Sequence, residues 1–322
     1  MALVILLHQS ENIPVFTEAY TFVEMFCGAG WCSRCMRCAG HPTAQMDLCL
    51  SDPERKSSNQ NEMDLLTESG FLLALATVLN GKMDECLYLV AMVCGSFVTI
   101  NKGTNKRYPW SPEGDTSCPS VKIGNLLANR CVLLLHAICA MGGCWVLEQS
   151  RSSMFGWMPR FRAFSRMQEK VWTACWWMAH YMSKFPKRHI AWSNSPTVGK
   201  LDLGTLCRSV MKMLAKSGKR SATTYESRGR KRFVGSKFLR STQTYPPRFG
   251  FRLVRLHDAF CRNRVIPEPC DSILEMSAHT IFHILEWGDL WEDAGAVEIL
   301  QWIRGNKHLQ LGEWRELFPT RL

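Results

Sequence analysis

Residues 26–41, FCGAGWCSRCMRCAGH, constrain the fold more than any other stretch of this sequence. They hold four cysteines and a histidine, a density that suits a metal site. They also follow a short apolar run, TFVEMF, and place two glycines directly before a helix-like pattern. The segment is therefore either a metal-binding knuckle or the turn between a strand and a helix.

Helical geometry argues against the metal-binding alternative. A tetrahedral zinc ion needs four ligand atoms about 2.0–2.3 Å from the metal. If residues 31–39 form a helix, Cys32 and Cys38 are separated by about 9 Å along its axis, at about 1.5 Å per residue. An iron–sulfur loop with this cysteine spacing needs irregular backbone and usually a further, distant cysteine. We expect a helix and no metal, and keep a cysteine-ligated metal as an alternative.

Strand and helix patterns alternate along the chain. Strands are expected at 21–26, 42–50 and 85–97 and within CWVLEQ, TACWWMA and HIAWSN; helices are expected at 31–39, 63–81 and 121–143. Such alternation predicts an α/β fold whose parallel sheet is covered by helices on both faces. The division we predict is an N-terminal lead at 1–20, an α/β domain at 21–199, a basic loop-rich extension at 200–264 and an acidic helical tail at 265–322.

The net charge of +11 is concentrated in one block. Residues 151–264 alone carry 25 Lys and Arg against 4 Asp and Glu, whereas both flanking segments are net acidic. A concentrated positive field suits a polyanion, with nucleic acid as the first partner. The alternative is a solvated basic face that neutralises the acidic tail.

Cysteine usage and the apolar runs predict the compartment. The fifteen cysteines are spread through apolar segments, unlike a short secreted disulfide framework. The start, MALVILLHQSENIPVF, lacks the basic region of a signal peptide. The longest apolar stretch is interrupted by His136 and by Gly142-Gly143. We expect an intracellular chain with mostly reduced thiols and no membrane association.

Two glycines and two acidic residues suggest a cofactor turn. Gly28 and Gly30 follow a strand and open a helix, so backbone N–H groups there can face a ligand. Glu24 lies near the end of the first strand, and Asp47 near the end of the next. An acid at that second position suits the ribose hydroxyls of a nucleotide-type cofactor.

These residues carry a family resemblance. FVEMFCGAGWCSRCMRCAGHPTAQMDL resembles the first motifs of S-adenosylmethionine-dependent methyltransferases and is most similar to the cytosine-5 DNA methyltransferases. MDLLT resembles the third motif, and VAMVCGSF, WVLEQ and FPKRHIAWSN lie in the expected order for three later ones. The match spans 21–194, and uncharacterised protist proteins with the same core are similar too. It implies a Rossmann-like class I methyltransferase sheet.

The resemblance also implies a cofactor, S-adenosylmethionine, and the residues that hold it. Asp64 corresponds to the acid that approaches the adenine ring. The full set that the resemblance assigns to the cofactor is Glu24, Phe26, Gly28, Gly30, Asp47 and Asp64.

For catalysis the resemblance implies a covalent mechanism. Cys94 would attack C6 of cytosine, Glu148 would hold or protonate N3, and Arg188 would give electrostatic support. In a duplex the target base would be flipped out. The motif departs from the family, because Val93 and Gly95 replace its Pro and Gln. Amino-group methylation is not supported, because residues 94–97 lack the amide or carboxylate that grips an exocyclic amine.

The basic segment is the expected nucleic-acid surface. KRSATTYESRGRKR, at 219–232, resembles a bipartite nuclear-import pattern and predicts a nuclear protein. Unpaired bases could stack on the aromatic residues interleaved in the basic segment, which are Tyr225, Phe233, Phe238 and Tyr245. The acidic tail could bind a protein partner. The second hypothesis is a non-catalytic relic of the fold that binds nucleic acid or protein. The predicted nucleic-acid contacts are Lys187, Arg228, Arg230, Lys231 and Arg232.

Overall fold

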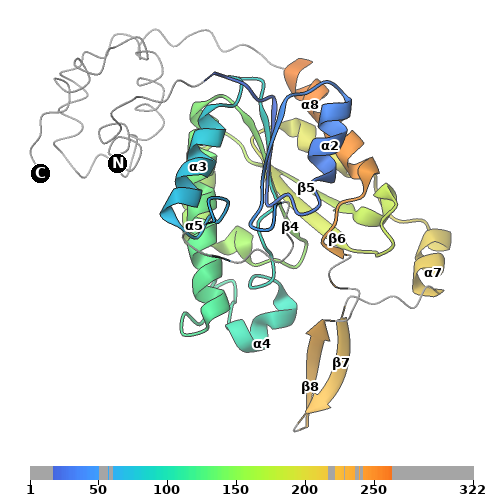
Figure 1. Cartoon of the computed structure of the whole chain (residues 1–322). Coiled ribbons are helices and arrows are strands. Elements are labelled where there is room, and N and C mark those ends of the chain that lie inside the picture. The colour runs from blue at the N-terminus through green and yellow to red at the C-terminus, as the bar shows by residue number, and fades with distance from the viewer. Residues whose placement is uncertain are drawn as a thin grey trace, which may run out of the picture.

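The computed structural model describes residues 17–50, 57, 61–216, 222–227, 229–235, 239 and 242–262. Within them a six-stranded sheet lies between two layers of helices (Figure 1). The predicted lead, apart from residues 17–20, and the predicted acidic tail lie outside the described residues.

The sheet is mixed, with strand order β2-β1-β3-β4-β6-β5. Its strands are β1 (Phe22–Met25), β2 (Thr43–Met46), β3 (Leu87–Val90), β4 (Cys144–Ser150), β5 (Trp172–Trp177) and β6 (Arg188–Ser193). The first four are parallel, but β6 is antiparallel to both β4 and β5. The prediction of an all-parallel sheet is therefore wrong. The chain between β5 and β6 is too short for the helical crossover that parallel neighbours need.

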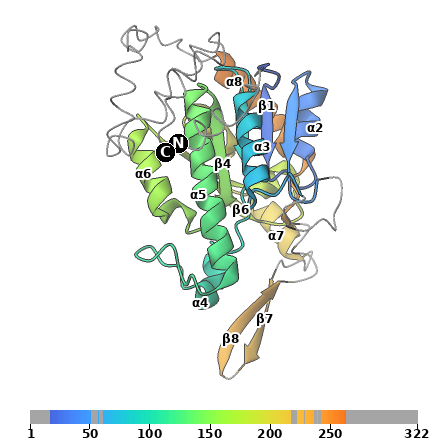
Figure 2. The ribbon, with the colours of Figure 1, turned by 60° about the vertical axis from the view of Figure 1, so that its left-hand side comes forward.

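Helices cover both faces of the sheet (Figure 2), and each face buries its own apolar cluster. The strands alternate, so that Val23 and Met25 of β1 enter one cluster and Phe22 the other. The first cluster is covered by α3 (Glu68–Leu79), α5 (Pro119–Ala140) and α6 (Pro159–Met167), and the second by α2 (Trp31–Cys38) and α8 (Pro247–Arg262). Burial of both faces explains why the strands read as nearly continuous apolar runs.

The basic segment contributes to the core of the sheet domain. Helix α8 packs against α2, and its Phe249, Leu253 and Leu256 are buried in the second cluster. The boundary predicted at residue 199 therefore does not separate the basic segment from the domain. The remaining elements are η1 (Thr99–Asn101), α4 (Lys102–Asn105), η2 (Phe155–Trp157), η3 (Met178–Tyr181), η4 (Pro196–Leu201), α7 (Arg208–Lys216), β7 (Ala222–Ser227) and β8 (Arg230–Gly235).

Helix α5 is the one described helix that is long and apolar enough to cross a membrane. More than half of its most apolar window is buried inside the protein. Its side chains Leu134, Leu135 and Ile138 belong to the first cluster, against the sheet. In this fold the apolar composition of α5 is accounted for by packing.

Arg107 organises the long polar loop between η1 and α5. Its side chain is only 1% exposed and lies 4.1 Å from the centre of the Phe97 ring. It donates hydrogen bonds to the carbonyls of Ser96 and Pro112 and to the side chain of Asn125. Burial lowers the pKa of Arg107 to about 10, so it stays charged at neutral pH.

We expect Arg107→Ala to lower the free energy of unfolding by about 3 kcal/mol, because it leaves several buried acceptors unpaired and opens a cavity. Urea denaturation measures the change. The matched control is Arg166→Ala on the exposed side of α6, which should stay within about 0.5 kcal/mol of the wild type. Equal effects of the two substitutions would contradict the role of Arg107.

Candidate functional site at the carboxyl edge of the sheet

The strand order changes direction between β1 and β3, which makes the carboxyl edge there a topological switch point of the sheet. The chain leaves β1 for β2 on one side and later returns to β3 on the other side. In open α/β sheets, ligands bind at the carboxyl edge where the strand order reverses in this way. The residues that follow the two strands are 26–30 after β1 and 91–97 after β3. Both segments were selected from the sequence as candidate site residues.

The segment after β1 is a tight turn with left-handed backbone at three positions. Phe26, Gly28 and Gly30 have φ values of 60°, 52° and 65°. A Cβ added to Gly30 would lie 2.0 Å from Nε2 of Gln45, so the Gln45 side chain would have to move, and the positive φ favours glycine there as well. A Cβ added to Gly28 would meet nothing within 4 Å. Gly30 therefore packs against Gln45 of β2, whereas the space next to Gly28 is free of protein atoms.

Glu24 lies under this turn and ties it to α2. The side chain is 0% exposed, and Oε2 accepts hydrogen bonds from the backbone N–H and the hydroxyl of Ser33, at 2.8 and 2.6 Å. Burial raises the pKa of Glu24, and the Ser33 hydrogen bonds partly offset this effect. Glu24 therefore holds the first turn of α2 in place from below.

Asp47 follows β2 and closes the turn from the other side. Its two carboxylate oxygens accept the backbone N–H groups of Gly28 and Cys49, each at 2.9 Å. A carboxylate has about four lone-pair sites, so each oxygen can accept a further hydrogen bond. The predicted cofactor residues Glu24, Gly28, Gly30 and Asp47 thus form one connected unit.

A surface hollow of about 360 Å³ adjoins this unit. Its walls include two cationic side chains of α2, Arg34 and Arg37. The Arg37 guanidinium donates to the side chains of Thr43 and Gln45, which holds it against β2. The volume is at the lower end of the range of ligand pockets. The lining residues are Gly28, Ala29, Arg34, Arg37, Gln45, Cys49 and Leu50.

Asp64 is buried and shapes the loop before α3. Its Oδ1 accepts the backbone N–H of Leu66 at 2.9 Å, and Oδ2 accepts the hydroxyl of Ser57. The backbone of Gly70 approaches Asp64 so closely that a Cβ would lie 2.0 Å from the Asp64 carbonyl oxygen. In this arrangement the Asp64 carboxylate is occupied within its own loop.

Glu148 is buried on β4 beside His189, which the sequence analysis did not select, and Tyr245, which it expected to stack on bases. Its carboxylate contacts Nδ1 of His189 and accepts the hydroxyl of Tyr245. Burial alone would raise the pKa of Glu148, but His189, Lys187 and Tyr245 together hold it below its usual value. The carboxylate is therefore ionised at neutral pH.

The strand period would have identified His189 in the sequence. In β6, His189 shares a face with Ala191 and Ser193, both buried, whereas the predicted catalytic Arg188 points to the other face. Arg188 is exposed, and its guanidinium lies 5.4 Å from the centre of the Trp177 ring. The residue of this strand that contacts Glu148 is therefore His189.

Cys94 lies in the turn after β3 rather than at the end of the strand. Strand β3 ends at Val90, and Gln149 of β4 donates a hydrogen bond to the carbonyl of Met92 in this turn. Burial raises the pKa of the Cys94 thiol; Glu148 adds to this effect and Lys187 opposes it. The fold therefore brings Cys94 within electrostatic range of Glu148 and Lys187, as a protonated thiol.

Three of the predicted nucleic-acid residues lie on a two-stranded hairpin, whereas Lys187 directly precedes β6. Strand β8 carries Arg230, Lys231 and Arg232, which pair with Ser227, Glu226 and Tyr225 of β7; Arg228 lies outside the described residues. The hairpin projects beyond the sheet at the end where α4 lies (Figure 1). That end is the carboxyl edge, because the side-chain amides of Asn101 in η1 and Asn105 in α4 donate hydrogen bonds to the carbonyls of Gly95 and Ser96, in the turn after β3.

The cysteine-rich segment that opened the sequence analysis is helical, as predicted. Helix α2 spans Trp31–Cys38, with Cys32 and Cys35 buried and Cys38 exposed. Burial raises the pKa of both buried thiols. Within the described part of the chain, no group of three ligand residues is built from these cysteines.

The described residues thus form an α/β fold compatible with a Rossmann-like sheet, with candidate site residues gathered at its carboxyl edge. No family model, no curated protein and no solved structure matches this chain.

The buried Glu24 carboxyl makes stability depend on pH. Its pKa in the folded protein lies above the ordinary value of 4.5, so the folded state keeps a proton that the unfolded state has lost. This group therefore lowers the free energy of unfolding as the pH rises from 4.5 through the folded pKa. Glu24→Gln keeps an acceptor for Ser33 without the charge. We expect the free energy of unfolding of the variant to rise relative to that of the wild type across this pH range.

Urea denaturation at stepwise pH values measures this difference. Glu226→Gln, on the exposed face of β7, is the matched control and should follow the wild-type curve. Parallel curves for wild type and Glu24→Gln would show that the Glu24 carboxyl is not destabilised by burial.

Proposed function

We propose that this chain is an S-adenosylmethionine-dependent methyltransferase that acts on nucleic acid. The observation that carries the proposal is the glycine turn between the carboxylates of Glu24 and Asp47, at the position in the sheet where ligands bind. The methyltransferase-like motifs of the sequence fall on this same turn. The mixed sheet with its reversed strand β6 is compatible with the methyltransferase class.

The residues of the turn suit the proposed cofactor. The space above Gly28 is open, and Asp47 keeps lone pairs for ribose hydroxyls. Arg34 and Arg37 in the adjoining hollow suit a carboxylate group. The loop of Asp64 would approach the adenine ring. S-adenosylmethionine, when bound, supplies an electrophilic methyl group.

Nucleic acid is the proposed substrate class because of where the positive charge lies. The net charge of residues 151–264 is +21, and the basic strand β8 projects beside the carboxyl edge (Figure 1). Lysine and arginine side chains there would neutralise backbone phosphates. The import-like pattern at 219–232 supports a nuclear location in this proposal.

Cytosine-5 transfer is the proposed reaction because Cys94 lies within electrostatic range of both Glu148 and Lys187. A resting thiol must lose its proton before it attacks C6, and Lys187 would stabilise the thiolate. Glu148, held by His189 and Tyr245, would take up the proton that the Cys94 thiol releases and pass it to N3 as the thiolate adds to C6. The Glu148 carboxylate would then accept the hydrogen bond from the N3–H group.

A second candidate function is a non-catalytic module that binds nucleic acid or protein. Two observations favour it. The pKa of Cys94 is raised by burial, which opposes nucleophilic attack, and Glu148 is ionised and already bonded on both oxygens. Both candidate functions use the basic surface. They differ in whether the residues at the carboxyl edge catalyse methyl transfer.

Cofactor binding is tested by calorimetric titration of the purified chain with S-adenosylmethionine. We expect saturable binding that Asp47→Asn weakens at least tenfold, about 1.4 kcal/mol, because the variant loses the charge that faces the ribose. Asp202→Asn, at the exposed end of η4, is the control and should bind as the wild type does. Circular dichroism verifies that each variant is folded. A folded wild type without binding would favour the non-catalytic module.

The covalent step is tested with radiolabelled S-adenosylmethionine and cytosine-containing DNA or RNA. We expect Cys94→Ser to reduce methyl transfer by roughly a thousandfold or more while cofactor binding is retained. The control is Cys207→Ser, which removes an exposed thiol that does not belong to the turn after β3. This substitution should leave the rate of methyl transfer unchanged. If Cys94→Ser transfers methyl groups at the wild-type rate, the covalent mechanism is wrong.

A further inference from the structure

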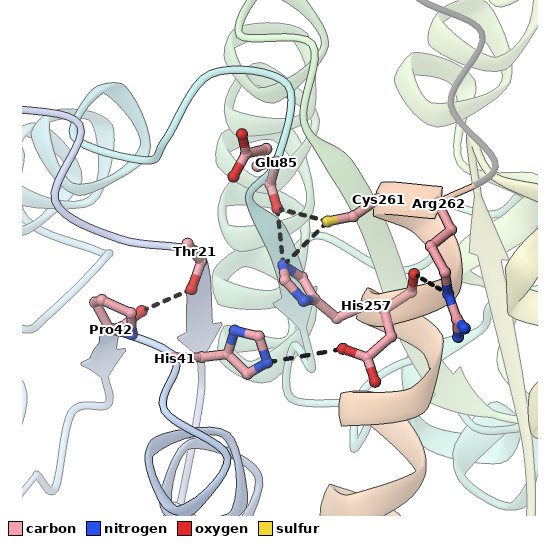
Figure 3. Close-up of polar contacts among 8 residues, drawn as sticks. Thr21, His41, Pro42, Glu85, His257, Cys261 and Arg262 are labelled. Atoms are coloured by element: carbon pink, nitrogen blue, oxygen red, sulfur yellow. Dashed lines mark hydrogen bonds and ion pairs between the residues drawn. The ribbon is translucent and has the colours of Figure 1, made fainter.

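A separate group of potential metal ligands lies at the opposite, amino-terminal edge of the sheet (Figure 3). His41 lies just before β2, whereas His257 and Asp258 lie on α8. One ligand atom from each residue lies within 4.8 Å of the other two. The fold brings them together because α8 packs against α2, directly before the loop that carries His41.

His257 is the buried member of this group. Its side chain is 4% exposed, and Nε2 lies 2.9 Å from the carbonyl oxygen of Glu85. A carbonyl oxygen can only accept, so Nε2 carries the hydrogen and Nδ1 of the neutral ring carries the lone pair. That Nδ1 atom is buried and has no hydrogen-bond partner. A buried acceptor without a partner is costly, which points to a ligand that the protein itself does not supply.

His41 and Asp258 form the more accessible side of the group. Nε2 of His41 lies 3.9 Å from Oδ1 of Asp258, beyond hydrogen-bond distance. The His41 ring meets the His257 ring edge to face, with centres 4.5 Å apart. Both side chains are partly exposed, so they are free to adjust toward an ion.

We propose that His41, His257 and Asp258 bind a divalent transition-metal ion, with zinc as the best match. Imidazole nitrogens and one carboxylate are ligands that zinc prefers, at about 2.0–2.2 Å. Tetrahedral ligand atoms at these bond lengths lie about 3.3 Å apart, so the group closes by about 1 Å or somewhat more on binding. Water takes the fourth position.

The hydrogen bond from His257 to Glu85 has the form expected of an outer-shell contact. A metal-bound histidine usually donates its second N–H to a carbonyl or carboxylate, which sets the tautomer and the ring orientation. Cys261 lies on this side as well, with Sγ 3.7 Å from Nε2 of His257 (Figure 3). The thiol is therefore near the hydrogen-bonded nitrogen and is not one of the three ligands.

An ion at this position would fasten α8 to the loop that connects α2 with β2. Helix α2 begins directly after the glycine turn. An ion bound near the other end of α2 would hold this helix in place and would thereby stabilise the glycine turn. Such an ion binds only the folded state and raises its stability in proportion to the logarithm of the metal concentration.

The test uses the full chain, stripped of metal with a chelator and kept reduced, and titrates it with zinc chloride and with cobalt(II) chloride. Calorimetry gives the stoichiometry, and the cobalt spectrum reports the ligand type, because thiolate ligands add an intense near-ultraviolet band. His41→Ala and Asp258→Asn remove accessible ligands without opening the core. His180→Ala and Asp202→Asn are the matched controls.

We expect one equivalent of cobalt without a thiolate band, and zinc affinity at least tenfold weaker in His41→Ala and in Asp258→Asn. The controls should bind as the wild type does. Zinc should raise the melting temperature of the wild type and the controls more than that of the two ligand variants. The proposal is overturned if the folded wild type binds no metal, or if both ligand variants retain wild-type affinity, which would assign the metal to cysteines.

Discussion

The Glu24 carboxylate is the contact on which the functional edge of this protein depends. It is buried at the end of β1 and accepts both the backbone N–H and the hydroxyl of Ser33. These two hydrogen bonds fasten the first turn of α2 to the sheet, which leaves the intervening residues no path other than a tight, left-handed turn. Because burial raises the pKa of this carboxyl, the fold accepts an energetic cost to keep an acidic residue here.

Two further polar contacts extend this support across the carboxyl edge. Asp47 holds the backbone of Gly28 from β2, and the contact between Glu148 and His189 joins β4 to the reversed strand β6. Breaking a buried polar contact leaves the remaining group without a partner, which is costly, so these contacts hold the strands in one arrangement. The same contacts position the residues of the carboxyl edge. They also keep Glu148 ionised, so this residue has no proton of its own to donate to a substrate.

Sequence reasoning predicted the parts of the site that depend on local chain geometry. The strand, glycine turn and helix at 21–39 follow from short-range patterns, and the structure confirms them. Sequence reasoning was wrong about the direction of one strand and about which side chain of that strand faces Glu148. Strand β6 runs antiparallel because its connection to β5 is short, and Arg188 was selected although its neighbour His189 faces Glu148.

The sequence by itself determined the α/β class, the helical nature of the cysteine-rich segment and the placement of Glu24, Gly28, Gly30 and Asp47 around one turn. Each of these depends on residues close together in the chain, where periodicity and backbone preference act directly. Only the tertiary structure decided that α8 covers α2 and that Tyr245 reaches Glu148. It alone brings His257 and Asp258 to His41. Those contacts join residues far apart in the sequence, and burial of the second apolar face of the sheet is what brings them together.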